Sequence, residues 1–342
     1  MKKTSTSVKI CLLALLAVIT LGNSVKAQLI TPSDKRKLQH KEDTLKEYAR
    51  YMITDEEPAD RMVSDSIFVR TLVRALQIKN SFYYPFDSIQ GVSRLYAPDS
   101  TFRIFTWNMQ FDDYYCRQKG AIQMKTKDGS LKLIPLRDVS EFTDNAKDSV
   151  RTKNNWIGAI YYNIIKTQYN NKDYYTLFGI DFNTPMSTKK WVEVMHFDER
   201  NEPLFGGQFF SFAEDTVPKP VAYRYGLEYK KDARVLLNYV KDLKLILVDH
   251  LISETDQQDL PWTFVPDGDN EAFKWENGKW MHVDKAFDYK VDMRGVDPYM
   301  GNPPVEDPLM DKKGNVNMKK LDEQSEKNKT KEKPKTGNER KD

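Results

Sequence analysis

The sequence predicts a mainly β protein, built as an antiparallel meander sheet or a partly closed barrel, with α-helices before it and a disordered tail after it. From about Phe102 onward, the apolar pattern changes from a helical period to the strand period of about 2. The pairs Asp128-Gly129 and Asn277-Gly278 suit the tight turns of β-hairpins. No stretch between consecutive strands is long enough for a helical crossover, so neighbouring strands are expected to be antiparallel.

Residues 1–27 have the features of a secretory signal peptide. Three lysines precede the apolar run from Ile10 to Leu21, and this run is too short to cross a bilayer. Val25-Lys26-Ala27 resembles a small-x-small cleavage site, so the mature chain is expected to begin at Gln28. An uncleaved membrane anchor is the alternative interpretation.

Charge and cysteine content narrow the function class. The chain has 53 Lys and Arg against 50 Asp and Glu, and the leader accounts for four lysines and no acid. This near-balance argues against a nucleic-acid-binding protein, which needs a concentrated positive field. Cys11 lies inside the apolar run, so no lipid anchor is expected. Cys116 is the single cysteine of the mature chain, which excludes an internal disulfide and a multi-cysteine zinc site; we expect a half-buried structural residue.

Residues 28–100 are an expected helical segment. The first helix begins near Ser33, a favourable N-cap residue, and one of its faces carries Leu38, Leu45, Tyr48, Ala49 and Met52. The second helix is expected from Ser64 or Asp65 to about Lys79, and one of its faces carries Phe68, Leu72 and Leu76. Both helices are predicted to cover one end of the sheet, with a docking arm as the alternative.

Residues 101–296 are the expected antiparallel β domain. Its strands are predicted near Phe102–Asn108, Ala121–Thr126, Leu131–Leu136, Gly158–Tyr169, Tyr174–Phe182, Trp191–Phe197, Leu204–Phe212, Ala222–Tyr229, Arg234–Val240, Leu243–Ile252, Glu271–Trp275 and Lys279–Val283. Along one of them, Tyr223, Tyr225 and Leu227 alternate with Arg224, Gly226 and Glu228. This alternation predicts that the first three residues face a core and the other three face water.

Residues 297–342 are predicted to be a proline-containing linker followed by a disordered charged tail. Four prolines between positions 298 and 308 favour an extended segment. From about Asp311, the chain is rich in Lys, Glu, Asn and Thr and nearly free of apolar residues. Such a composition cannot bury enough apolar surface to fold.

The sequence lacks the short motifs of the common enzyme classes. A phosphate loop, a dinucleotide-binding glycine pattern, a nucleophile elbow and an HExxH zinc motif are all absent. This favours a protein that is not an enzyme and needs no cofactor. The candidate catalytic residues are Asp181, Asp249 and His250. Because Asp249 and His250 are neighbours on a predicted strand, they point to opposite faces and form no direct dyad; a half-buried structural histidine is the alternative.

One candidate metal site stands at a predicted strand end. His196 is followed by Asp198 and Glu199 at a strand-to-turn junction, where imidazole and carboxylate groups can hold a hard cation. The alternative is a solvated hairpin end without a metal.

Aromatic side chains are the candidate ligand-binding residues. Trp156, Trp191, Trp275 and Trp280, together with nearby tyrosines, are numerous enough to provide a row that stacks on sugar rings or a peptide. Aromatic residues on strands are also frequent core residues, which is the alternative interpretation.

A short motif recurs more often than composition predicts. Asp followed by Ser or Thr, and then by an aliphatic residue, Met or Thr, is expected about once by chance. The hydroxyl residues of its six occurrences are Thr44, Ser66, Ser88, Ser100, Ser149 and Thr216. The motif resembles the O-glycosylation consensus of exported Bacteroidota proteins. Helix caps and turns favour the same pairs and are the alternative explanation.

Several segments between residues 64 and 284 resemble a group of uncharacterised exported proteins of Bacteroidota. They are Phe102–Asn108, Trp156–Tyr162, Tyr174–Asp181, Phe197–Glu199 with Leu204–Gly206, Val248–Leu251, Val265–Gly268 and Phe273–Trp280. The resemblance implies export and brings no known activity with it. Members of the group tend to have Trp-Asp-Gly where this chain has Ile180-Asp181-Phe182.

The sequence therefore predicts a non-catalytic exported protein, most simply periplasmic, that binds a ligand or assembles with another protein of the cell envelope. The expected partners are an envelope protein or a glycan, and no transmembrane segment is expected after removal of the leader. The alternatives are a periplasmic hydrolase acting on glycan or peptide, and an aromatic glycan-binding module.

Overall fold

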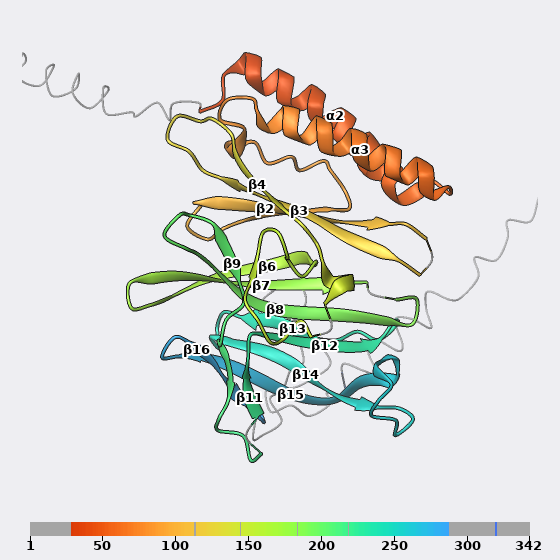
Figure 1. Ribbon diagram of the computed structural model, residues 1–342, viewed down its shortest axis with the longest axis vertical. Helices are drawn as coiled ribbons and strands as arrows, with labels where there is room; N and C mark the ends of the chain where they lie inside the picture. Colours follow the sequence, from red (N-terminus) through yellow and green to blue (C-terminus); the bar gives the residue numbers. More distant parts are fainter. Residues whose placement is uncertain are drawn as a thin grey trace, which may run out of the picture. The chain divides into compact units, whose positions relative to one another are not determined.

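The computed structural model describes residues 29–112, 114–143, 145–182, 184–217, 219–286 and 319. The predicted signal peptide and the predicted disordered tail, apart from residue 319, lie outside these residues. The chain is mainly β, with antiparallel sheets preceded by two helices, as predicted (Figure 1). It divides into two compact units, the second of which begins at Gln208. The segment Tyr223–Leu227 returns to the first unit before the chain continues in the second.

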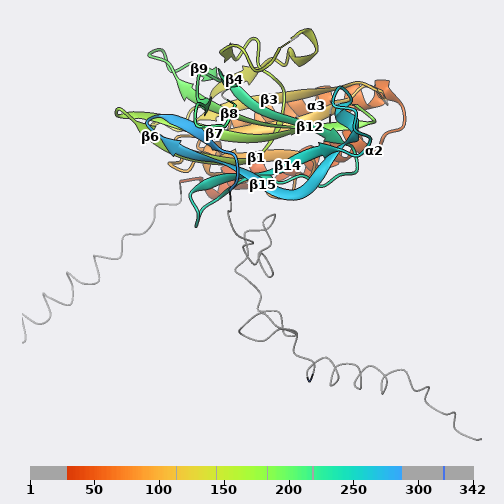
Figure 2. The same ribbon diagram turned by 90° about the horizontal axis from the view of Figure 1, so that it is seen from below.

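The first unit consists of a helical layer and two sheets. The helices are α2 (Pro32–Thr54) and α3 (Pro58–Leu76). The first sheet is a meander of β1 (Val92–Tyr96), β2 (Phe102–Gln110), β3 (Cys116–Met124) and β4 (Lys132–Leu136). The second sheet has the order β5 (Arg151–Thr152), β9 (Pro203–Phe205), β8 (Ser187–Phe197), β7 (Lys172–Asp181) and β6 (Ile160–Tyr169), and β12 (Arg224–Lys230) pairs with β8. β6, β7 and β8 run alongside one another in both views (Figures 1 and 2).

The helices follow the predicted amphipathic pattern. Thr31, rather than Ser33, caps α2: its side-chain oxygen accepts a hydrogen bond of 3.1 Å from the Asp34 backbone N–H. The predicted start of the second helix at Ser64 or Asp65 is wrong, because α3 begins at Pro58. Proline at the first helical position costs no hydrogen bond, since that N–H has no partner within the helix. In the part of the chain that the structure describes, no helix is long and apolar enough to cross a membrane.

Strand β2 is the centre of the first unit because both of its faces are buried. Phe102 and Ile104 pack in a core shared by the two sheets, and Phe105 and Trp107 pack against α2 and α3. This alternation is the period of 2 expected for a strand. Strand β1, which pairs with β2, was not predicted from the sequence, because most of its residues are only half-buried.

The prediction that Arg224 faces water is wrong. Arg224 is 0% exposed, and its Nε donates a hydrogen bond of 2.7 Å to Glu193 Oε2, whose residue is 2% exposed. The two other nitrogens of its guanidinium donate hydrogen bonds of 2.7–2.8 Å to backbone carbonyls. Nη1 donates to Ala146 and Ser149, and Nη2 donates to Phe205. Every nitrogen of the guanidinium is therefore engaged, as a buried charge requires.

The other carboxylate oxygen of Glu193 extends this network. It accepts a hydrogen bond from the Tyr161 hydroxyl, which in turn accepts one of 2.7 Å from the Trp156 indole N–H. Burial, and then the neighbouring Glu193 charge, raise the pKa of Tyr161 far above its ordinary value. Gly206 lies beside Arg224 with φ +81°, and a Cβ there would approach the guanidinium to 2.9 Å. A side chain at 206 would thus meet both backbone strain and a clash.

Arg103 is a second buried arginine of the first unit. It donates hydrogen bonds to Gln123 Oε1, the Tyr96 hydroxyl, and the carbonyls of Tyr84 and Ser81 at 2.6–3.0 Å. Its guanidinium carbon lies 4.7 Å from the centre of the Phe105 ring, a favourable cation–π distance. Burial lowers the pKa of Arg103 to about 10. Neutral oxygens and aromatic faces hold this cation in place.

The second unit is built on one sheet. Its order is β11 (Lys219–Ala222), β10 (Phe210–Phe212), β16 (Lys279–Val283), β15 (Phe264–Glu276), β14 (Leu245–Ser253) and β13 (Leu237–Val240). The pair β10–β16 is parallel, and the other pairs are antiparallel. The single predicted strand Leu204–Phe212 is wrong: Gly206 and Gly207, with φ 81° and 149°, break it into β9 and β10.

His282 lies between two carboxylates in the second unit. Its Nδ1 is 2.7 Å from Asp215 Oδ1 and its Nε2 is 3.0 Å from Glu271 Oε2, and its side chain is 2% exposed. The rings of Phe212 and Phe273 lie 5.1 and 5.0 Å from the imidazole. Burial lowers the pKa of His282, but the hydrogen bonds to Glu271 and Asp215 outweigh it and raise the pKa above its ordinary value.

Candidate functional site

Asp249 and His250 have separate partners in the second unit. The Asp249 carboxylate accepts hydrogen bonds from the Leu236 backbone N–H at 2.7 Å and from Asn270 Nδ2 at 2.9 Å. His250 Nδ1 lies 2.8 Å from Asp267 Oδ2, and the His250 side chain is 43% exposed. Asp249 thus fixes the backbone between neighbouring segments of the sheet, and His250 belongs to a different pair. Asp181, the third candidate catalytic residue, belongs to the first unit.

Asp181 and Trp191 line one pocket of about 470 Å³ in the first unit. Asp181 lies opposite Lys189 on the neighbouring strand and accepts a hydrogen bond of 2.7 Å from Gln118 Nε2. Glu141, from the segment after β4, also lines this pocket and accepts a hydrogen bond of 2.7 Å from the Tyr115 hydroxyl. Burial, followed by this hydrogen bond, raises the pKa of Tyr115 to about 12. Cys116 lines the same pocket and is half-buried, as predicted.

The other tryptophan candidates differ in accessibility. Trp156 and Trp280 are both 0% exposed, so they are core residues and present no surface to a ligand. Trp275 is half-buried and packs edge-on against Trp280 at 5.2 Å between ring centres. Of the four candidates, Trp191 and Trp275 therefore keep accessible surface.

His196, Asp198 and Glu199 line a pocket of about 700 Å³ at the end of β8. One Asp198 carboxylate oxygen accepts hydrogen bonds from the Arg200 and Glu202 backbone N–H groups at 2.9 and 2.8 Å. Burial, and then the Lys172 charge, lower the pKa of His196. Asp198 thus closes the turn. Within the described residues, no group of three or more His, Cys, Asp or Glu side chains is arranged to hold a metal ion.

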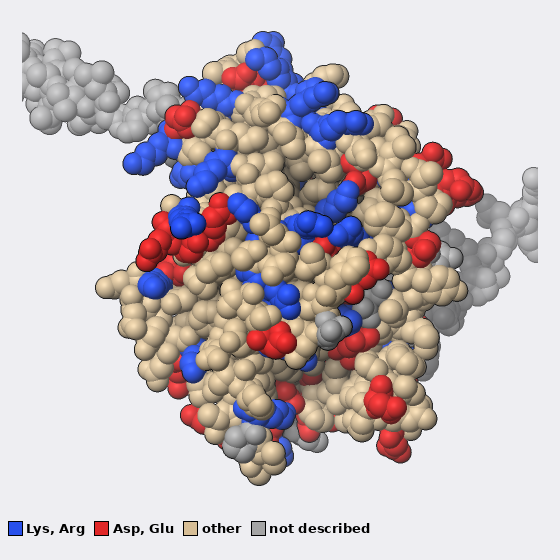
Figure 3. All heavy atoms as spheres, in the orientation of Figure 1, with Lys and Arg blue, Asp and Glu red and all other residues tan. Residues whose placement is uncertain are grey.

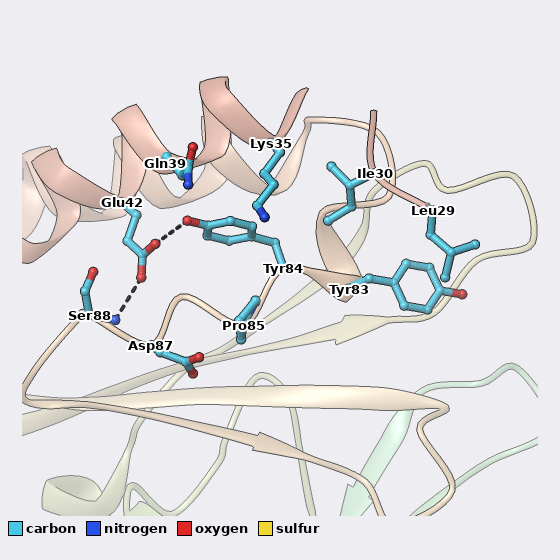
Figure 4. A pocket seen from close by; sticks show the side chains of 10 residues that line it. All are labelled: Leu29, Ile30, Lys35, Gln39, Glu42, Tyr83, Tyr84, Pro85, Asp87 and Ser88. Atoms are coloured by element: carbon cyan, nitrogen blue, oxygen red, sulfur yellow. Dashed lines mark hydrogen bonds between the residues drawn. The ribbon is translucent and has the colours of Figure 1, made fainter. Parts of the chain in front are cut away.

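Another candidate site is a pocket beside α2 that we did not predict (Figure 4). We call it the α2 pocket, and its volume is about 670 Å³. It is lined by Leu29, Ile30, Lys35, Gln39, Glu42, Tyr83, Tyr84, Pro85, Asp87 and Ser88.

Glu42 fixes the polar wall of the α2 pocket. The Tyr84 hydroxyl donates a hydrogen bond to Glu42 Oε2, and the Ser88 backbone N–H donates one of 2.8 Å to Oε1 (Figure 4). Burial, and then the hydrogen bond to Glu42, raise the pKa of Tyr84 well above its ordinary value. Because both carboxylate oxygens are engaged, Glu42 ties α2 to the segment that carries Tyr84 and Ser88.

The segment opposite α2 is held in an uncommon backbone conformation. Phe86 has φ +58°, which is unfavourable for a residue with a large side chain. Its fully buried ring packs against Tyr84 at 4.8 Å between ring centres, and the Arg103 guanidinium carbon lies 5.2 Å from it. Before α2, the Leu29 carbonyl accepts a hydrogen bond of 2.6 Å from Asn80 Nδ2. The pocket is therefore largely pre-formed.

The chemistry of the α2 pocket suits binding. Leu29, Ile30, Tyr83 and Pro85 supply apolar walls, and Lys35 and Gln39 supply polar groups that extend from α2 (Figure 4). A mainly apolar cavity with a few placed polar groups is typical of small-ligand sites. The sequence carries one signal for it: Glu42 occupies the same helical face as Leu38 and Leu45, where an acid requires a buried partner.

No protein-family model, curated protein or solved structure matches this chain.

Proposed function

We propose that this chain is a non-catalytic, exported binding or assembly protein of the cell envelope, and that the α2 pocket is its ligand site. The observation that carries the proposal is the pre-formed α2 pocket, in which Glu42 fixes a polar wall opposite apolar side chains. The signal-peptide-like leader supports export, most simply to the periplasm. The expected ligand is a segment of another envelope protein or a glycan.

The hydrogen bonds of the candidate catalytic residues Asp249 and His250 favour a binding function over a hydrolase. Asp249 holds two donors of the sheet, and His250 is paired with Asp267. General-base catalysis needs a carboxylate or imidazole within reach of a nucleophile and free to accept its proton. Trp191 and Trp275 are half-buried aromatic residues that can stack on sugar rings, so they support a glycan as the ligand.

We expect a photo-crosslinking residue at position 83 to capture the ligand. Benzoylphenylalanine is introduced in place of Tyr83 in the native host, and the irradiated protein is analysed by mass spectrometry. The matched control carries the same residue in place of Tyr169, which is 40% exposed on the β6–β7 hairpin of the same unit. A defined adduct at position 83 alone supports the site. Equal adducts at both positions, or none at position 83, would show that the α2 pocket is not the ligand site.

We also propose that the six Asp-Ser/Thr motifs are O-glycosylated. Ser66, Ser88, Ser100 and Thr216 are exposed, and the two others are half-buried. We expect an intact mass above that of residues 28–342 for protein from the native host, and the polypeptide mass for protein made in a host without O-glycosylation. Equal masses of the two proteins would contradict the proposed glycosylation, and the motifs would then be explained by helix caps and turns.

A further inference from the structure

The folded chain gathers positive charge that the sequence distributes between Arg36 and Lys127. Lys and Arg side chains collect over α2 and the β3–β4 hairpin (Figure 3). We define the basic face as the exposed or half-buried residues Arg36, Lys41, Arg70, Arg74, Lys79 and Lys127.

Three neighbouring elements of the first unit carry the basic face. The helices α2 and α3 pack against each other with a short connection, so the first half of α2 lies beside the second half of α3 (Figure 1). The Asn80 backbone N–H donates a hydrogen bond of 2.8 Å to the Gly129 carbonyl, which holds the β3–β4 turn next to the end of α3. The six basic residues therefore lie on neighbouring segments of the first unit.

Acidic residues neutralise this surface only in part. Asp34 pairs with Lys37 at 2.8 Å, and the Asp128 carboxylate accepts hydrogen bonds from the backbone and side chain of Ser130. Asp43 and Glu47 are the other exposed acids of α2. Asp55, Glu56, Glu57 and Asp60 lie at the opposite end of the helical pair. The two other acids of the helices, Glu42 and Asp65, are buried and hydrogen-bonded to other groups.

We propose that the basic face docks on an anionic lipid bilayer. Its charges are spread over three elements rather than along one groove, which fits an extended planar anion better than a single polymer strand. Leu29, 51% exposed, is held beside Asn80 and adds an apolar group to the same region. Basic residues and an apolar anchor act together in membrane-surface binding. This docking goes beyond the proposed ligand site, because Leu29 is the one lining residue of the α2 pocket that it uses.

The test is co-sedimentation of the expected mature chain, residues 28–342, with lipid vesicles. We expect binding to vesicles of equimolar phosphatidylcholine and phosphatidylglycerol, and not to phosphatidylcholine alone. The triple variant Arg36→Glu, Arg70→Glu, Arg74→Glu is expected to lower the partition coefficient more than about tenfold, since each basic residue near the surface strengthens binding about fivefold. Added salt is expected to weaken the binding of the wild type.

A matched triple variant controls for net charge and for the lysine-rich C-terminal residues. Arg137→Glu, Lys172→Glu, Arg200→Glu makes the same charge change at exposed positions elsewhere in the first unit and is expected to bind within about twofold of the wild type. Hydrogen exchange of α2 and α3 checks that each variant is folded. Equal losses in both variants, no binding to the anionic vesicles, or binding to soluble polyphosphate but not to vesicles would each overturn the proposal.

Discussion

Arg224→Met is expected to lower the free energy of unfolding of the first unit by about 3–5 kcal/mol. The variant leaves the buried Glu193 carboxylate without its cation, and it leaves the carbonyls of Ala146, Ser149 and Phe205 without their donor. Removal of one partner of a buried pair is costly because the remaining charge stays desolvated. Hydrogen-exchange mass spectrometry of peptides from β6, β7 and β8 measures the loss of stability. These peptides report on the first unit separately from the second.

The matched control for Arg224→Met is an ion pair of the same unit that reaches solvent. Lys153 Nζ lies 2.6 Å from Glu202 Oε2, with side-chain exposures of 35% and 41%. Lys153→Met is expected to cost less than about 1 kcal/mol, because exposed pairs gain little over hydration. Similar protection losses in the two variants would contradict a buried network that holds this unit together.

His282→Leu is expected to destabilise the second unit by about 3 kcal/mol. The variant leaves Asp215 and Glu271 close to each other without the imidazole between them. Leucine fills part of the space between Phe212 and Phe273, so the loss arises from charge more than from packing. Exchange of the β14, β15 and β16 peptides measures the effect. His250→Leu is the control: its side chain is 43% exposed, and a loss below about 1 kcal/mol is expected.

The contribution of His282 also depends on pH in a defined direction. Its pKa in the folded chain is raised above the ordinary value of 6.5, so the folded state binds its proton more tightly than the unfolded state does. This contribution is fully present below pH 6.5 and is lost as the pH rises through the folded pKa. Protection of β15 and β16 is expected to fall over that range in the wild type, and to lack this component in His282→Leu. An unchanged pH profile in the variant would show that other groups control it.

Local patterns were enough to predict the fold class. The apolar face of α2 and the period of 2 along β2 are each set by residues that are close in sequence, and the structure confirms both. The predictions were wrong where a residue distant in sequence determines whether a side chain is buried. Alternation placed Arg224 in water, but Glu193 and three carbonyl oxygens, supplied by other segments, make its burial favourable.

The α2 pocket and the His282 cluster escaped prediction for the same reason. Glu42 and Tyr84 are 42 residues apart, and His282 and Asp215 are 67 apart, so no sequence spacing relates them. The net charge of the chain did not predict the basic face. It adds up acidic and basic residues that lie on different surfaces of the folded chain. The local signal for the α2 pocket was Glu42 on the apolar face of its helix. This position predicts that Glu42 has a polar partner but does not predict which residue it is.

The path of the chain sets an order in which the protein is completed during synthesis. The Glu193 side chain is made before the chain leaves for Gln208–Ala222, and its cation, Arg224, arrives only with the returning segment. A chain that ends at residue 207 would therefore have the Glu193 carboxylate of the first unit without its cation. Neither unit corresponds to one continuous stretch of the gene, so truncation after residue 207 removes a part of the first unit as well as the second.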